Sequence, residues 1–168
     1  RYGKIMIMTD QDHDGSHIKG LLFNIFQSIW PSLYKKDGFI TSMLTPIIKV
    51  RHQSTNEVKQ FYSLTDFDKW KESVGNNMKY WKIKYYKGLG TSTPEEAKDY
   101  FRNMMITNYV YNGKTSDDSI DLAFNKKRAD DRKKWLMKYN KEDVLDYTVS
   151  DIPYETFVNK DLIHFSNR

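Results

Sequence analysis

The spacing of apolar residues in the first fifty positions predicts a strand, a helix and a second strand. Lys4–Thr9 is a short apolar run without helical spacing, which indicates a buried strand. A helix follows, whose apolar face repeats at three- and four-residue spacing: Ile18, Leu21, Leu22, Ile25, Phe26, Ile29 and Trp30. Ser16 is the expected N-cap of this helix and Pro31 its stop. Phe39–Val50 supplies the second strand, which Pro46 interrupts, so this order opens a β-α-β unit and favours a parallel sheet.

The middle of the chain continues the alternation of helix and strand. Thr65–Glu72 predicts a short helix, and Trp81–Tyr86 alternates as a strand does. Lys87–Gly90 then turns into a helix that is expected to begin near Pro94. This alternation predicts an α/β fold.

Polar and charged residues dominate the last third of the chain. Asn108–Ser119 is rich in turn-forming residues and predicts a surface loop. Leu122–Tyr139 predicts one long, highly charged helix. Asp151–Pro153 marks an expected boundary, and residues 154–168 predict the start of another element.

Composition narrows the class of protein without identifying its function. Hydrophobic residues make up 39% and charged residues 29% of the 168 residues, so the chain is expected to fold. The absence of cysteine excludes disulfides and thiolate metal sites. The apolar runs are too short to span a bilayer, so we expect no membrane partner. The net charge of +5 suits a polyanion, although solvated surface lysines produce the same value.

Three carboxylates stand at alternate positions directly after the first predicted strand, at Asp10, Asp12 and Asp14. Alternate residues of an extended segment point the same way, and clustered like charges favour a neutralising cation. Carboxylate oxygens suit Mg²⁺ or Ca²⁺, and open α/β folds assemble their sites at the carboxyl ends of strands. The competing hypothesis is an aspartate-rich turn that only caps the following helix.

Two other kinds of metal site match parts of the same segment. An EF-hand loop matches its first acidic positions, but the twelfth position is Leu21 where the motif needs a bidentate glutamate. A zinc site built on His13 and His17 is a weaker hypothesis, because no clear helical placement brings both histidines together.

Residues Ile5–Leu22, which include Asp-Gln-Asp-His-Asp-Gly-Ser-His-Ile-Lys-Gly, closely resemble the TOPRIM signature of eukaryotic-type DNA topoisomerase II, a type IIA enzyme. Further matching segments follow in family order: Thr45–Val50, Lys84–Ser92, Leu122–Lys127, Asp130–Lys133 and Phe157–Lys160. The resemblance covers essentially the whole chain. Another TOPRIM enzyme, such as a primase or nuclease, would share the acidic turn but not the later segments.

The resemblance implies a TOPRIM, Rossmann-like parallel sheet flanked by helices over residues 1–150. Residues 151–168 would then be the start of the linker or of a winged-helix domain. The glutamate that begins the TOPRIM site, the ATPase domain and the nucleophilic tyrosine are expected to lie outside this chain. The chain is therefore expected to be an inactive fragment of an ATP-hydrolysing enzyme.

The resemblance also implies roles for the acidic residues. Asp10 and Asp12 match catalytic Mg²⁺ ligands, which act by placing charge beside the reacting phosphate. Asp14 matches the third acid of the metal site, where it orients water or the other ligands.

Two basic residues, Arg132 and Lys133, match family positions that approach the DNA backbone, where contacts position DNA without reading its sequence. The residues alone equally support a solvent-exposed helical face whose charges pair with each other, as Lys127 with Asp131. Lys87–Gly90 has two competing interpretations, a phosphate-binding loop or a structural turn. The resemblance adds a third, a role in communication with the ATPase region.

The function implied by the resemblance is that of an ATP-dependent DNA topoisomerase II. Such an enzyme changes DNA topology by transient double-strand cleavage, strand passage and religation. Double-stranded DNA, Mg²⁺, a homodimeric parent protein and a nuclear location are expected with it. The alternative from another class is a DNA-binding module without catalysis, which the basic stretch Lys126–Lys134 supports.

Overall fold

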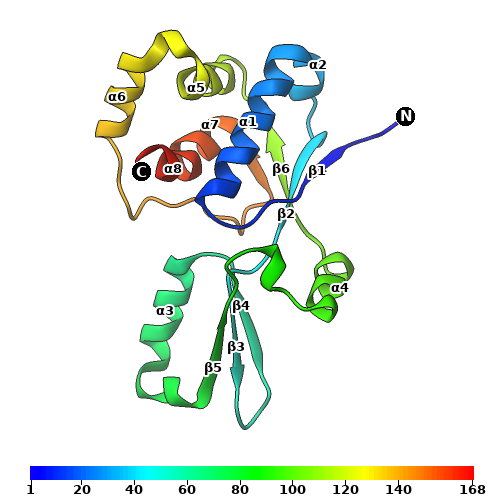
Figure 1. The fold of residues 1–168 in the computed structure, drawn as a ribbon, viewed down its shortest axis with the longest axis vertical. Coiled ribbons are helices and arrows are strands. Elements are labelled where there is room, and N and C mark those ends of the chain that lie inside the picture. Colours follow the sequence, from blue (N-terminus) through cyan, green and yellow to red (C-terminus); the bar gives the residue numbers. More distant parts are fainter. The chain divides into compact units, whose positions relative to one another are not determined.

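The computed structural model describes residues 1–168 and divides into two compact units (Figure 1). The first unit combines Arg1–Met43 with Ile106–Arg168, and the second is Leu44–Met105. Both units mix helices and strands, which confirms the predicted α/β class. None of the helices combines the length and the apolar character that crossing a membrane requires.

A four-stranded sheet carries the first unit, with the strand order β1-β2-β6-β7. These strands are β1 (Ile5–Ile7), β2 (Ile40–Leu44), β6 (Met105–Val110) and β7 (Asp151–Pro153). β1 pairs in parallel with β2, and β6 pairs in parallel with β7. All five residues of β2 are buried, as expected for a strand covered on both faces. The predicted parallel sheet is confirmed in this unit.

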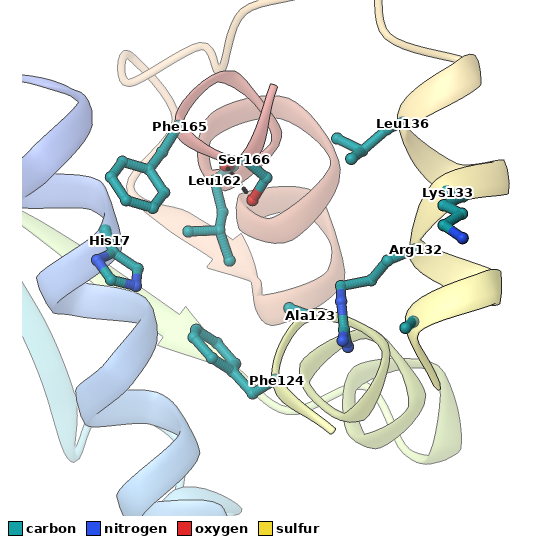
Figure 2. A pocket seen from close by; sticks show the side chains of 10 residues that line it. His17, Ala123, Phe124, Arg132, Lys133, Leu136, Leu162, Phe165 and Ser166 are labelled. Carbon is teal, nitrogen blue, oxygen red and sulfur yellow. Dashed lines mark hydrogen bonds between the residues drawn. The ribbon is translucent and has the colours of Figure 1, made fainter. Parts of the chain in front are cut away.

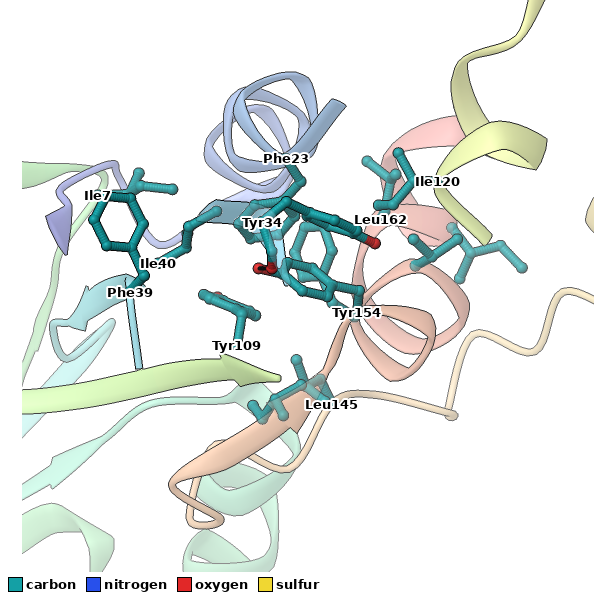
Figure 3. Close-up of a cluster of buried hydrophobic side chains, with 14 of the residues drawn as sticks. Ile7, Phe23, Tyr34, Phe39, Ile40, Tyr109, Ile120, Leu145, Tyr154 and Leu162 are labelled. Carbon is teal, nitrogen blue, oxygen red and sulfur yellow. Dashed lines mark hydrogen bonds between the residues drawn. The ribbon is translucent and has the colours of Figure 1, made fainter. Parts of the chain in front are cut away.

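Helices supply the rest of the first unit: α1 (His13–Ile29), α2 (Pro31–Tyr34), α5 (Lys114–Phe124), α6 (Ala129–Met137), α7 (Tyr154–Phe157) and α8 (Ile163–Ser166). A 3₁₀ turn, Lys126–Arg128, precedes α6, and a π-helical turn, Val158–Leu162, joins α7 to α8. Phe23 of α1 is fully buried and packs on Tyr109, Tyr154 and Phe157 at centroid distances of 4.6, 5.1 and 5.0 Å. Figure 3 shows this aromatic cluster beside the strands.

The second unit is built on an antiparallel sheet with the order β4-β3-β5, which the sequence did not predict. Its strands are β3 (Ile48–His52), β4 (Val58–Phe61) and β5 (Trp81–Tyr85), and its helices are α3 (Leu64–Val74) and α4 (Pro94–Arg102). The 3₁₀ turns Gly75–Tyr80 and Leu89–Thr91 connect them. Ile48, Val50 and Phe67 form its small buried core. The helices predicted at 65–72 and from Pro94 are confirmed.

The predicted strand Phe39–Val50 is in fact two strands that belong to different sheets. Pro46 lies between them, so the interruption was predicted correctly but the single strand was wrong. Proline cannot donate to a strand ladder, and here the chain leaves one sheet and enters another.

The first helix is confirmed, but its predicted cap is wrong, and of its predicted apolar face only Leu22 and Phe26 pack against the core. Asp12, not Ser16, is the N-cap. The apolar positions Ile18, Leu21, Ile25 and Ile29 are 40–60% exposed. The helix instead buries a face of mostly small or polar residues: Gly15, Ser16, Lys19, Gly20 and Phe23. A Cβ on Gly20 would lie 2.9 Å from the Phe124 ring, so glycine allows the close helix packing that selects this face.

Two predictions in the last third of the chain are also wrong. Asn108–Ser119 is not a surface loop, because it contains the second half of β6 and the start of α5, with Tyr109 1% exposed. Leu122–Tyr139 is not one helix, because α5 ends at Phe124 and a 3₁₀ turn precedes α6. Asn125 breaks the helix there by accepting a hydrogen bond from the Lys127 amide at 2.9 Å.

Residues 151–168 pack within the first unit. Ile152 of β7 is buried, as are Tyr154, Phe157 and Leu162, each at most 2% exposed. These side chains are part of the main hydrophobic cluster of the unit. The expectation of a linker or winged-helix domain starting at 151 stays a prediction.

Candidate metal and nucleic-acid site

The acidic turn lies between β1 and α1 and folds tightly onto the start of the helix. Asp12 Oδ1 accepts a hydrogen bond from the Gly15 amide at 2.7 Å, which caps α1. A Cβ on Gly15 would lie only 1.9 Å from the backbone oxygen of Asp10. Only glycine therefore permits this close return of the chain, and Gly15 determines the shape of the turn that carries Asp10 and Asp12.

The three predicted acidic residues occupy different environments. Asp10 and Asp12 share the turn, where Asp10 is partly buried and Asp12 is exposed. Asp14 lies in the first turn of α1, and its Oδ1 is 3.2 Å from Arg168 Nη1 at the surface. No group of three histidine or acidic residues is arranged to hold a metal ion. The helix, which begins at His13, separates Asp14 from the extended part of the turn.

The donor set of the turn can be compared with the needs of Mg²⁺. Mg²⁺ commonly binds proteins through one or two carboxylates and keeps several waters. Asp10 and Asp12 are hard oxygen donors on one short turn, and capping by Asp12 engages its Oδ1. Capping and metal binding are thus compatible, and the pair fits part of a magnesium site.

The histidines considered for zinc pack against aromatic rings. His13 stacks on His164 with centroids 5.8 Å apart. His17 stacks on Phe165 at 4.1 Å and lies 6.5 Å from Phe124. These contacts account for both residues as packing groups of α1.

Arg128 organises the basic stretch. Its guanidinium lies 2.7 Å from Asp118, 3.2 Å from Asp121 and 3.0 Å from Asp131, which ties the 3₁₀ turn to α5 and α6. Ion pairs thus connect residues that are three apart, Arg128 with Asp131 and Asp130 with Lys133, whereas the predicted pair Lys127–Asp131 is four apart.

The two predicted DNA contacts differ in their surroundings. Arg132 Nη1 donates to the backbone oxygens of Leu122 at 3.0 Å and Asn125 at 2.6 Å, so it satisfies carbonyls at the end of α5. Lys133 is 78% exposed, and only a surface pair with Asp130 at 3.4 Å engages its ammonium. Lys133 is therefore available to a phosphate, whereas Arg132 also supports the junction between two helices.

A pocket of about 370 Å³ lies beside this junction (Figure 2). Figure 2 shows Arg132 reaching from α6 toward α5, with His17 and Phe165 facing each other across from it. The pocket is largely apolar, and its rim carries both cations. Its lining consists of His17, Ala123, Phe124, Ala129, Arg132, Lys133, Leu136, Leu162, Phe165 and Ser166.

Sequence reasoning missed a polar network beneath the acidic turn. Lys19 is only 3% exposed, and its Nζ lies 3.5 Å from the Tyr147 hydroxyl. Tyr147 donates a short hydrogen bond to Asp161, which also accepts one from Ser16 at 2.8 Å. A serine and a lysine three residues apart on a helix, as Ser16 and Lys19 are, usually lie on the surface. The only signal in the sequence that this face is buried was the pair of glycines, Gly15 and Gly20.

The Lys87–Gly90 loop belongs to the second unit. Thr91 donates from its amide and its hydroxyl to the Gly88 oxygen, at 3.2 and 2.7 Å, which closes a turn. Glu96 accepts hydrogen bonds from Lys84 at 2.7 Å and from Tyr86, so residues on both sides of the loop are joined. These contacts favour the structural turn, and a role in communication stays a prediction.

The chain is similar to a known family and to named proteins over most of its length. A family model described as the C-terminal associated domain of TOPRIM matches residues 43–168. The chain is 49% identical to DNA topoisomerase 2 of Arabidopsis thaliana and 49% identical to DNA topoisomerase 2-alpha of Homo sapiens. Both alignments cover 99% of this chain but only 11% and 12% of the relatives, so the chain spans about a tenth of their length.

A solved structure is similar over the same extent. It is described as the Plasmodium falciparum topoisomerase II DNA-binding, cleavage and re-ligation domain, and it matches with a TM-score of 0.90 and 47% identity. The match covers 99% of this chain and 22% of that chain. The predicted resemblance to eukaryotic topoisomerase II is confirmed, and the chain belongs to the family described as the C-terminal associated domain of TOPRIM.

Proposed function

We propose that this chain is part of the DNA cleavage core of a eukaryotic-type, ATP-dependent DNA topoisomerase II. The parent enzyme would cleave both strands of DNA transiently, pass a second duplex and religate the break. The names of the relatives and the described activity of the similar Plasmodium structure support this proposal. ATP would be used by a domain outside this chain, and we expect a nuclear homodimer.

The acidic turn carries the chemical part of the proposal. Asp10 and Asp12 would hold Mg²⁺, with Asp14 orienting water beside them. When bound, the ion would stabilise negative charge on the oxygens of the phosphate that reacts. The chain itself shapes the site that would hold the ion. Gly15 permits the tight turn, and the hydrogen bond from its amide to Asp12 orients that carboxylate.

Asp12→Asn in the full-length enzyme tests the role of Asp12 in metal binding more sharply than Asp12→Ala does. Asparagine caps a helix as well as aspartate does, so the fold of the turn is retained while the charge is removed. We expect DNA cleavage across a magnesium titration to fall by at least about 100-fold, as for loss of a strong electrostatic contact, with DNA binding unchanged.

Asp37→Asn, which changes an exposed carboxylate elsewhere in the same unit, is the matched control and should leave cleavage unchanged. Unchanged cleavage by Asp12→Asn, and by Asp10→Asn in parallel, would show that the turn only caps α1.

A DNA-binding role without catalysis is the second candidate, and the exposure of Lys133 favours it. Lys133→Ala should weaken DNA binding equally for all sequences and reduce the slope of log K against log salt by about 1. Glu142→Gln, an exposed change of charge on the same unit, should leave that slope unaltered. An unaltered slope in Lys133→Ala would remove this residue from the interface.

A further inference from the structure

The acidic turn is connected by hydrogen bonds to a distant part of the chain. Ser16 Oγ lies 2.8 Å from Asp161 Oδ1 and 3.2 Å from the backbone oxygen of Asp12. The Tyr147 hydroxyl donates to the other carboxylate oxygen of Asp161. Asp161 thus reaches the turn through Ser16 at the start of the helix, while Tyr147 holds the second oxygen of the carboxylate.

The direction of these bonds follows from the charges around them. Burial, reinforced by the negative charge of Asp161, raises the pKa of Tyr147 well above its ordinary value. The hydroxyl therefore keeps its proton and donates a hydrogen bond to Asp161. Lys19 lies on the same side, with its Nζ 5.4 Å from the Tyr147 ring centroid, so a buried cation faces this tyrosine.

We propose that Asp161 is a positioning residue for the acidic turn: Tyr147 orients its carboxylate, and the carboxylate holds Ser16, whose hydroxyl contacts the Asp12 backbone oxygen. Asp161 accepts both hydrogen bonds, and a charged acceptor makes them stronger than neutral ones. The consequence for metal binding rests on the proposed function. The positioning of the turn by Asp161 does not depend on that function.

Glu155 provides a matched carboxylate elsewhere in the same unit. It accepts a hydrogen bond from Ser116 at 2.6 Å and one from Asn112 at 2.8 Å. Like Asp161, it is partly buried and joins segments far apart in sequence. Its partners lie near the start of α5, so its loss tests general loosening of the fold without touching the acidic turn.

Amide hydrogen exchange in the metal-free, full-length enzyme tests the hold directly. The reporters are the amides of Gly15 and Ser16, which donate to Asp12 Oδ1 and to its backbone oxygen. Asp161→Asn and Tyr147→Phe should each speed their exchange by roughly three- to tenfold, the effect of losing about one net hydrogen bond. Glu155→Gln should leave both rates unchanged. Unchanged rates in the first two variants, or an equal increase in all three, would overturn the proposal.

Binding of Mn²⁺, followed by electron paramagnetic resonance, separates this proposal from the proposed function. Asp161→Asn should raise the Mn²⁺ dissociation constant several-fold, and the Mg²⁺ concentration that half-saturates cleavage should rise equally, while cleavage at saturating Mg²⁺ is restored. Reduced maximal cleavage at an unchanged Mg²⁺ midpoint would refute a positioning role. If Asp12→Asn left metal dependence untouched, the proposed function would fail, yet the exchange result would still decide the hold on the turn.

Discussion

Helix α1 has two faces, and hydrophobicity alone does not separate the buried face from the exposed one. The buried positions are a serine, a lysine, two glycines and Phe23, and Leu22 and Phe26 are half-buried against the core. The opposite face carries Ile18, Leu21, Ile25 and Ile29, which are 40–60% exposed. Close approach and satisfied polar groups therefore decide packing here more than apolar content does.

The comparison shows why glycine is informative beside polar residues. A Cβ on Gly15 would overlap the backbone of the acidic turn, and a Cβ on Gly20 would lie 2.9 Å from the Phe124 ring of α5. Ser16 and Lys19 are carried inward with the glycines and find partners in Asp161 and Tyr147. A buried polar group with partners costs far less than one without, so this face is stable.

The largest effect is expected from Phe23→Ala, which removes the one fully buried large apolar side chain of α1. Loss of a fully buried phenylalanine leaves a cavity and should cost about 3–5 kcal/mol in the free energy of unfolding. Urea unfolding of the 168-residue chain measures it. A cost below about 1 kcal/mol would mean that the aromatic cluster does not hold α1 in place.

Gly15→Ala is expected to have the next largest effect, because the new Cβ would overlap the Asp10 backbone oxygen. Backbone cannot move aside as a side chain can, so we expect about 1–3 kcal/mol of destabilisation and loss of the capping bond. Unfolding measurements give the cost, and exchange of the residue-15 amide reports the cap. Gly3→Ala, where a Cβ meets nothing within 4 Å, is the control and should be neutral.

A smaller effect is expected at Glu96, a partnered carboxylate of the second unit. Burial opposes its ionisation, but hydrogen bonds from Lys84, Tyr86 and Thr93 outweigh burial and lower the pKa of Glu96 to about 2. A depressed pKa stabilises the fold above the ordinary carboxyl range, and this stability is lost as pH falls toward 2. Glu96→Gln should cost about 1 kcal/mol at pH 7 and flatten the acid side of the stability curve. An identical acid limb in wild type and variant would contradict this.

The smallest effect is expected on the exposed face, where Ile25→Ser should change the free energy of unfolding of the chain by less than about 0.5 kcal/mol. Ile25 is 42% exposed and Phe23 is 0% exposed, so the substitution at Ile25 removes less buried apolar area. Urea unfolding beside Phe23→Ala, on the same helix, provides the contrast. A cost above about 1.5 kcal/mol would mean that this face is buried in solution.

Prediction from the sequence succeeded where a local signal was strong. The α/β class, the first strand and helix, the break at Pro46 and the family all followed from short motifs. It failed at Asn108–Ser119, where turn-forming residues lie in a buried strand and helix because Ser116 and Tyr109 find partners in Glu155 and Ser42. Such partners are 39 and 67 residues away and have no local signature.

The candidate site shows the same division. Asp10 and Asp12 were predicted because three acids at alternate positions stand out in a sequence, and Arg132 and Lys133 because they match family positions. The sequence by itself determined the acidic turn, the glycines that allow it and the family. Only the tertiary structure decided that α1 begins at His13, that Arg132 serves the end of α5 and that Asp161 reaches the turn. The physical reason is that capping, helix junctions and buried hydrogen bonds depend on which distant groups meet, and neither spacing nor hydrophobicity along the chain specifies that.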